Sequence, residues 1–308
     1  MTLIQPPLMV TGAVHPARAL RMMVRDLSRG SQGVTEGGDL KVRQTATPGP
    51  GVRVGAGSAI VLGAAFGQGS YTQYNVGDHL VPIAPTGGTG RTDLLVLRVE
   101  DPDFEGTRDP VKEDIGYFHV IPGVSATASA PPGMTALPLA RITIPPNCQT
   151  VTDAMITDLR KVANPRSEHQ VRVIGSFGYS AIGSQTNVWQ EWPASAGAQV
   201  SIDVPAWATS AYVVTELNGL RITDSVNIGF RQMIAGVAGN VDIVDADAVS
   251  YMGRTRSKMV DQYWWRPEQR GTSQTLMVQA ARYAKEGDID VNGNTTMHVE
   301  VDFVEGVY

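Results

Sequence analysis

The chain has 308 residues, of which 42% are hydrophobic and 18% charged, and this length is enough for two domains that each bury a core. Its net charge of −5 arises in the second half, because residues 1–165 carry 14 basic and 14 acidic side chains whereas residues 166–308 carry 11 and 16. Nucleic-acid binding by the second half is therefore not expected, since phosphate contacts need clustered Lys and Arg. Cys148 is the only cysteine, which excludes an internal disulfide and a Cys-based metal site.

The class is predicted to be mainly β, because 33 glycines and 19 prolines accompany few helical runs and indicate many turns between short strands. The N-terminal sequence MTLIQPPLMV has no basic segment before its apolar residues, and Pro6-Pro7 interrupts it, so we expect no signal peptide. No stretch approaches the roughly 18 apolar residues of a membrane span. If the protein acts outside a cell, we therefore expect it to leave by a route other than ordinary secretion.

A helix is predicted between His15-Pro16, where proline suits the first helical turn, and Gly30, which tolerates left-handed angles at the far end. Its apolar stripe is formed at helical spacing by Leu20, Met23, Val24 and Leu27. Beside the stripe runs a row of arginines, Arg18, Arg21, Arg25 and Arg29. The favoured interpretation is that the stripe covers the protein's own first sheet and the arginines face solvent. The alternative is a docking helix, whose stripe binds a partner while the arginines meet acidic groups; a membrane-surface helix is least favoured because three turns are short.

Residues 40–99 read as short strands separated by turns, as in a small β-sandwich or barrel. The continuous apolar run at 94–97 predicts a central strand covered on both faces. The acidic segment 101–114 has no liganding pattern, so a solvated loop is favoured over a metal site. Residues 123–138 are rich in Ser, Thr, Ala and Pro, which predicts an extended connector over the domain surface.

A strand is predicted at residues 139–144, where apolar and polar side chains alternate and β-branched residues dominate the second half. Pro145-Pro146 should end it at Ile144. Thr152 is the predicted N-cap of a short helix that places Met155, Ile156 and Leu159 on one face. A domain boundary is predicted at Asn164-Pro165, because proline cannot continue the helix.

The segments LARITIPPN and TDAMITDLR resemble the end of the N-terminal domain of siphophage minor tail proteins of the baseplate upper protein type. The resemblance extends backward through GDLKV at 38–42, VRVGAGSA at 52–59 and RTDL at 91–94, and so covers roughly residues 10–165. The pieces are short, and their order carries the resemblance. Residues 166–308 resemble no family.

The resemblance implies a structural component of a phage tail tip, located in the virion and released by lysis. It implies an arm and docking helix at residues 1–36, a tail-anchoring β domain at 37–165 and a distal domain at 166–308. The expected partners are other tail proteins and further copies of the chain, as a trimer or a multiple of three.

The distal domain is predicted to be a jelly-roll-like β-sandwich. Its strands are VRVIGSF, AQVSIDV, SAYVVTELNGLRI, QTLMVQAARYA and TMHVEVDFVE. Asn218-Gly219 and Asn292-Gly293 are two-residue hairpin signals. After the second, one face is apolar and one is polar and acidic, because Met297, Val299, Val301 and Phe303 alternate with His298, Glu300 and Asp302.

All five tryptophans lie in this domain. Tyr263, Trp264 and Trp265 form the candidate binding platform for a host-surface glycan, because in a strand Trp264 and Trp265 point opposite ways and one must leave the core. The favoured interpretation is plainer: one tryptophan packs inside and the other covers a neighbouring loop or subunit. Trp189 and Trp192, three residues apart, are candidates to close a trimer axis.

The sequence evidence for an enzymatic function is weak, and we expect no catalytic residue, no cofactor and no metal. The segment GYSAIG at 178–183 misses the nucleophile elbow by one residue, and neither a P-loop nor a dinucleotide fingerprint occurs. Asp288 and Asp290 begin like a calcium loop, but Val299 occupies its twelfth position. Asp245 and Asp247 could serve a polysaccharide-cleaving enzyme, the least favoured function, although such spacing is common on any solvated strand face.

Overall fold

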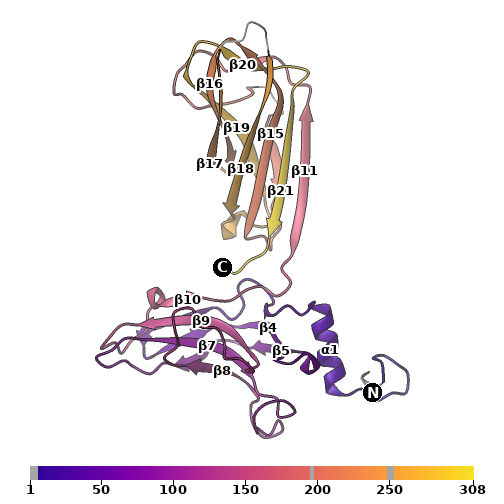
Figure 1. Cartoon of the computed structure of the whole chain (residues 1–308), viewed down its shortest axis with the longest axis vertical. Helices are drawn as coiled ribbons and strands as arrows, with labels where there is room; N and C mark the ends of the chain where they lie inside the picture. The colour runs from indigo at the N-terminus through magenta and orange to yellow at the C-terminus, as the bar shows by residue number, and fades with distance from the viewer. Residues whose placement is uncertain (1–5, 195–197, 248–252) are drawn as a thin grey trace. The chain divides into compact units, whose positions relative to one another are not determined.

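The structure is a computed structural model of the chain, and it describes residues 6–194, 198–247 and 253–308. Residues 1–5, which belong to the N-terminal sequence predicted to lack a signal peptide, lie outside the described residues. The chain forms two compact units, Met1–Pro165 with Gly306–Tyr308, and Arg166–Glu305 (Figure 1). The last three residues thus belong to the first unit, whereas the sequence suggested one continuous distal domain. No helix in the described ranges is long and apolar enough to cross a membrane.

The first unit is built from antiparallel strands and a helix near its N-terminus. Its elements are α1 (Ala17–Leu27), β1 (Gly33–Val34), β2 (Val42–Gly49), β3 (Gly51–Val54), β4 (Gly57–Leu62), the 3₁₀ turn η1 (Phe66–Gln68), β5 (Ser70–Asn75), β6 (His79–Pro82), β7 (Arg91–Val99), β8 (Gly116–Ile121), β9 (Ala136–Ile144), the 3₁₀ turn η2 (Asp153–Met155) and β10 (Ile156–Asp158). They pair in the orders β1-β4-β5, β2-β3-β6 and β10-β9-β7-β8, and these sheets share one aliphatic core.

β7 lies inside the third of these sheets, between β9 and β8. Leu95 belongs to the main core of the unit, whereas Leu94 and Val96 point to the opposite face and pack with Val124 and Met134. The prediction of a central strand covered on both faces is therefore confirmed. The predicted connector at residues 123–138 covers the face of β7 opposite the main core, because Val124 and Met134 belong to this connector.

The predicted helix after Thr152 is wrong. Only η2 forms there, and Thr152 makes no side-chain cap hydrogen bond. Ile156 then pairs with Ile142 of β9, and the chain continues as the edge strand β10. A free edge on β9 and two β-branched residues outweigh the local helix signal, as tertiary pairing often does. The prediction that β9 ends at Ile144 is confirmed.

The second unit is a sandwich of two antiparallel sheets, as predicted (Figure 1). Its elements are β11 (Ser167–Gly175), β12 (Ser180–Ala181), β13 (Gln190–Glu191), β14 (Val200–Asp203), β15 (Ser210–Thr223), β16 (Val226–Ile234), β17 (Val237–Ala246), β18 (Gly253–Trp264), the 3₁₀ turn η3 (Pro267–Gln269), β19 (Ser273–Ala284), β20 (Asp288–Val291) and β21 (Thr296–Val304). One sheet has the order β11-β21-β15-β20-β12 with β18 also on β15, and the other has the order β13-β19-β16-β17 with β14 also on β19.

The core of the sandwich lies between the two sheets. The predicted alternation of β21 is confirmed, because Val299 and Phe303 are buried against residues such as Ile228 and Phe230 of β16. Two strand pairings were not predicted. β16 and β17 form a hairpin whose turn, Ala235-Gly236, has positive φ angles of 48° and 80°, and β18 lies along β15 over twelve paired residues.

Both predicted hairpins are wrong. Asn218-Gly219 lies inside β15 as a bulge, because the register with β18 shifts between Asn218 and Leu220. Asn292-Gly293 joins β20 to β21, but these two strands pair with successive parts of β15 and not with each other. Gly219 has a φ of 77°, and a Cβ there would lie 2.6 Å from the carbonyl oxygen of Asn294. The glycine therefore admits a close approach of two backbone segments and not a reversal of the chain.

Candidate functional site

The predicted docking helix α1 lies beside β5 (Figure 1), and it contacts its own unit through arginines. Arg21 forms an ion pair with Asp101 at 3.2 Å, and its Nε donates to the carbonyl of Gln68 at 3.0 Å. The same guanidinium lies 5.2 Å from the ring centroid of Tyr71. Burial and then the hydrogen bond to Asp101 raise the pKa of Tyr71, so this phenol stays a donor. The contacts of Arg21 therefore stabilise its own unit.

Two further arginines of α1 meet η1. Arg18 donates from Nε to the carbonyl of Gly67, and Arg25 lies 4.6 Å from the ring centroid of Phe66. Glycine permits this approach, because a Cβ at Gly67 would lie 2.2 Å from the Arg18 guanidinium and one at Gly69 would lie 2.6 Å from the α1 backbone. The prediction that these arginines face solvent is wrong for Arg21 and Arg25, which are half-buried.

The apolar stripe of α1 is only partly covered as a result. Leu20 is 49% exposed and Leu27 is 71% exposed, while Met23 and Val24 are half-buried. The segment before the helix adds exposed apolar side chains, Met9, Val10 and Val14. A hollow of about 400 Å³ adjoins the stripe and is lined by Pro6, Pro7, Leu8, Ala19, Met22, Met23, Asp26 and Leu27. We call this exposed surface of the arm and α1 the N-terminal apolar patch.

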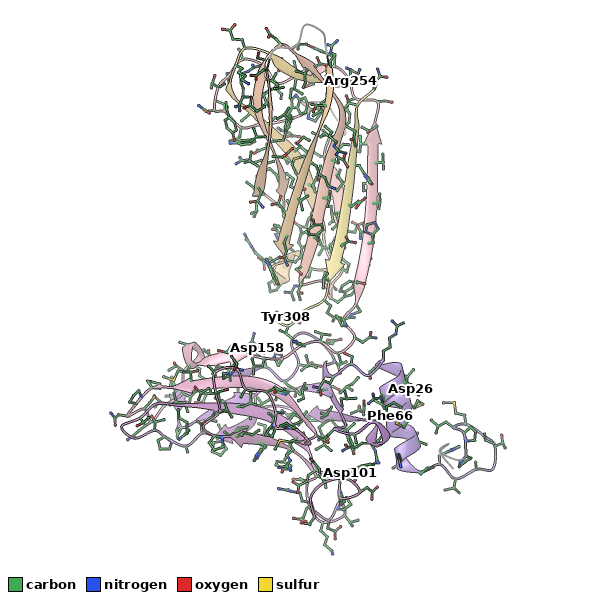
Figure 2. All side chains as sticks on the ribbon, viewed as in Figure 1. Asp26, Phe66, Asp101, Asp158, Arg254 and Tyr308 are labelled. Atoms are coloured by element: carbon green, nitrogen blue, oxygen red, sulfur yellow. The ribbon has the colours of Figure 1, made fainter. Side chains whose placement is uncertain are left out.

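The TDLR stretch that carries the resemblance ends on a buried arginine. Arg160 is 3% exposed, and its guanidinium donates to the carboxylate of Asp158 at 2.8 Å. It also donates to the backbone carbonyls of Gly37, Asp39 and Tyr308. Figure 2 shows Tyr308 on the side of the first unit that carries Asp158. One guanidinium therefore binds three segments that are distant in sequence.

The environment of Arg160 keeps its partner ionised. Burial opposes the charge on Asp158, but the hydrogen bonds and the positive charge of Arg160 outweigh it and hold the pKa of this carboxyl below its ordinary value. Close packing completes the contact, because a Cβ at Gly37 would lie 2.2 Å from the carbonyl oxygen of Gly306 and 2.8 Å from the Tyr308 ring. This cluster is structural, and no sequence pattern predicted that residues 306–308 take part.

The candidate glycan platform does not form as a group of three. Trp264 is 65% exposed, whereas Tyr263 and Trp265 are buried, with ring centroids 4.5 Å apart. Trp265 also lies 5.9 Å from Phe303 in the core. The prediction that one of the two tryptophans leaves the core is confirmed. Of the three side chains, only that of Trp264 is exposed to solvent.

The alternative role for Trp192 is also wrong. Its side chain is buried in the sandwich, 5.5 Å from the ring of Phe230, and so cannot close a trimer axis. Trp189 is half-buried, with the Arg231 guanidinium 4.1 Å from its ring centroid and Tyr283 at 6.1 Å.

The carboxylates considered for catalysis or metal binding are paired within the fold. Lys285 binds Asp245 at 2.5 Å and Asp247 at 2.9 Å, and these two carboxylates raise the pKa of its ammonium group. Asp290 binds Arg221 at 2.8 Å. Across residues 6–194, 198–247 and 253–308, no group of three or more His, Cys, Asp and Glu side chains could hold a metal ion.

Comparisons with known proteins add little to these observations. No protein-family model matches the chain, and no curated protein matches it. Among solved structures, the VP2 subviral particle of infectious bursal disease virus aligns over 90% of this chain and 75% of that chain, with 12% identity and a TM-score of 0.27. The Gt strain of that virus aligns over 90% and 76%, with 14% identity and a TM-score of 0.24. The insecticidal delta-endotoxin Cry8Ea1 of Bacillus thuringiensis aligns over 90% and 52%, with 10% identity and a TM-score of 0.21. Such low scores carry no argument about function.

Proposed function

We propose that this chain is a structural component of a phage tail tip, which assembles with copies of itself through its first unit. The sequence resemblance of residues 10–165 motivates the virion location. The N-terminal apolar patch is the observation that carries the assembly role. Exposed apolar surface on a folded unit marks a protein–protein, membrane or ligand contact, and three helical turns are short for a membrane-surface helix.

The orientation of α1 strengthens this proposal. A helix that existed only to cover its own sheet would bury its apolar stripe, since that burial stabilises the fold. Here the arginine row contacts the unit, and Leu20 and Leu27 remain exposed. The docking interpretation has two parts. The exposed stripe is consistent with the first part, in which the stripe binds a partner. The acidic and aromatic groups that meet the arginines belong to the same chain.

The mass of the full chain in solution tests self-assembly. At micromolar concentration, light scattering after size exclusion should give the mass of a trimer or of a multiple of three. The double substitution Leu20→Ser and Leu27→Ser should shift the protein to monomer, because it removes apolar area from the patch. Val76→Ser is the matched control, since Val76 is an exposed apolar residue on a loop of the same unit outside α1. A monomeric wild type, or a double variant that keeps the wild-type mass, would contradict the proposal.

Antibody labelling tests the location. Antibodies against residues 1–165 should bind the tail tip of virus particles from the source of this sequence, as seen by electron microscopy. Label on the head of the particle, or its absence from purified particles that contain the other tail proteins, would refute the tail-tip role even if the chain self-assembles.

A further inference from the structure

The outward face of β18 is a continuous surface with two chemical halves. Alternate side chains of the strand are buried, including Ser257, Met259, Asp261 and Tyr263. The intervening ones point away from the core, namely Arg254, Arg256, Lys258, Val260, Gln262 and Trp264. Because a strand rises about 3.4 Å per residue, this face is about 34 Å long. Arg254 lies at one end of the second unit in Figure 2, and β18 runs from there along the sandwich in Figure 1.

The first half of this face is basic. Arg254 stands directly opposite Arg221 of β15, which is a like-charge pair of the kind that destabilises a sheet. Asp290 neutralises Arg221 at 2.8 Å. Arg254 itself donates to the backbone carbonyl of Gly219, and among the described residues no carboxylate forms an ion pair with Arg254 or Lys258.

The third positive charge in this half, that of Arg256, can also bind an anion. Arg256 lies 3.5 Å from Glu216, and its side chain is 74% exposed, so solvent screens that pair strongly. The cluster of positive charge belongs to a half of the chain in which 16 acidic side chains outnumber 11 basic ones. The Asp242 carboxylate accepts from the backbone N of Lys258 at 3.1 Å but forms no ion pair with its ammonium group, so a bound anion would neutralise charge that the fold leaves unpaired.

The second half of the face is aromatic and polar. Trp264 is 65% exposed, and Tyr212 of β15 is 48% exposed. Trp264 pairs with Ser210, two residues from Tyr212, so the two aromatic residues are diagonal neighbours about 7–8 Å apart.

Polar groups flank the aromatic pair. Tyr212 is opposite Gln262 on one side and Asp302 on the other. Asp302 contacts His169 at 2.5 Å, and both side chains are half exposed. Flat rings match the apolar C–H face of a sugar ring, while the amide and carboxylate can bind its hydroxyls.

We propose that the outer face of β18 binds an anionic polysaccharide, with its acidic groups on Arg254, Arg256 and Lys258 and its sugar rings on Trp264 and Tyr212. Only a ligand that carries both repeated negative charge and neutral apolar ring faces uses both halves of the surface. A single nucleic-acid strand also combines charge with stacking, but such ligands are held by a positively charged groove that follows the whole backbone, whereas only one half of this face is basic. The activity is separate from self-assembly, because it belongs to the second unit.

Tryptophan fluorescence of the full chain tests the proposal with three probes, polygalacturonate, neutral dextran and single-stranded oligodeoxythymidylate. Polygalacturonate should give a saturable blue shift as Trp264 leaves water, and raising the salt from about 0.05 to 0.5 M should weaken its binding. Dextran should give no change, and the oligonucleotide should bind at least about tenfold more weakly than polygalacturonate. No shift with polygalacturonate, or equal binding of either other probe, would overturn the proposal.

Substitutions locate the site. Trp264→Ala should abolish the spectral shift, and the pair Arg254→Gln with Lys258→Gln should weaken polygalacturonate binding about tenfold and reduce its salt dependence. Arg172→Gln and Trp189→Phe are the matched controls, an exposed arginine and a half-buried tryptophan that lie off this face, and both should leave affinity unchanged. Tyr212→Ala should also weaken polygalacturonate binding, as measured by calorimetry. This variant tests the aromatic half of the site if Trp264→Ala does not fold. Unchanged affinity in the basic pair and in the folded aromatic variants would refute the site.

Discussion

The ion pair between Arg166 and Glu305 joins the two ends of the second unit. The backbone N and the Nε of Arg166 each donate to Glu305 at 3.0 Å, and the backbone N of Glu305 donates to the Arg166 carbonyl at 3.1 Å. Burial opposes the charge on Glu305, but the hydrogen bonds and charge of Arg166 outweigh it and hold the pKa of this carboxyl below its ordinary value. The pair therefore links folding of this unit to pH.

Glu305→Gln should destabilise the second unit and reduce its sensitivity to acid. A carboxyl whose pKa is lowered by folding contributes its full stability above the unfolded-state value of about 4.3, and loses it as pH falls through the folded value. At pH 7 we expect a loss of about 1–2 kcal/mol, less than for a fully buried pair because Arg166 is partly exposed. Urea unfolding at pH 7 and at low pH measures both effects. Glu286→Gln, at an exposed glutamate, should change neither; equal pH profiles for wild type and Glu305→Gln would contradict the prediction.

Among the elements, those with a clear residue pattern were predictable. The double-sided burial of β7, the end of β9 before Pro145-Pro146 and the alternation of β21 all follow from local sequence. Residues 152–160 were not predictable, because the pairing of Ile156 with β9 depends on a free strand edge that no local signal reveals. β18 was missed because most of its residues are charged or polar and it lacks the aliphatic run of its neighbours.

The two candidate sites, α1 and the Trp264 region, also depend on tertiary contacts that local sequence does not reveal. The helical stripe and the arginine row of α1 were both read from sequence, but their orientation was not. Arg21 binds Gln68, Tyr71 and Asp101, which lie 47 to 80 positions further along the chain. The alternation rule predicted that one tryptophan is exposed. It could not indicate Tyr212, which joins Trp264 only through the register of β15 with β18.

The two Asn-Gly dipeptides provide a matched test at this scale. Gly219→Ala should destabilise the second unit by about 1–3 kcal/mol, because its φ is 77° and the added Cβ meets the Asn294 carbonyl. Gly293→Ala should cost under about 1 kcal/mol, since a Cβ there has no neighbour within 4 Å. Urea unfolding compares them, and equal losses would mean that the bulge does not need glycine.

The second unit is an insertion within the sequence of the first. The chain leaves the first unit at Pro165 and rejoins it at Gly306. Within the first unit, the backbone N of Tyr308 donates to the Gly37 carbonyl at 3.1 Å, and the Tyr308 carbonyl accepts from Arg160 at 3.3 Å. The fold of the first unit therefore uses residues from both sides of the inserted one.

Removal of residues 306–308 should destabilise the first unit and leave the second unchanged. The change exposes the surface around Gly37 and removes one acceptor of buried Arg160, at an expected cost of about 1–3 kcal/mol. Scanning calorimetry should show one transition shifted to lower temperature and one unchanged. Tyr74→Ala, which removes an exposed tyrosine of the same unit, is the control and should shift neither. A truncated chain with both transitions in place would contradict the prediction.

The insertion also fixes an order of events on the ribosome. Residues 6–165 emerge first, yet the carbonyl of Tyr308 reaches Arg160 only after every residue from Arg166 to Glu305 has been translated. Domains generally fold as units during synthesis, and the inserted sandwich has all its strands before that point. Residues 6–165 are therefore made before the sandwich but completed after it, and the nascent chain must keep the surface around Gly37 open until translation of the sandwich has finished.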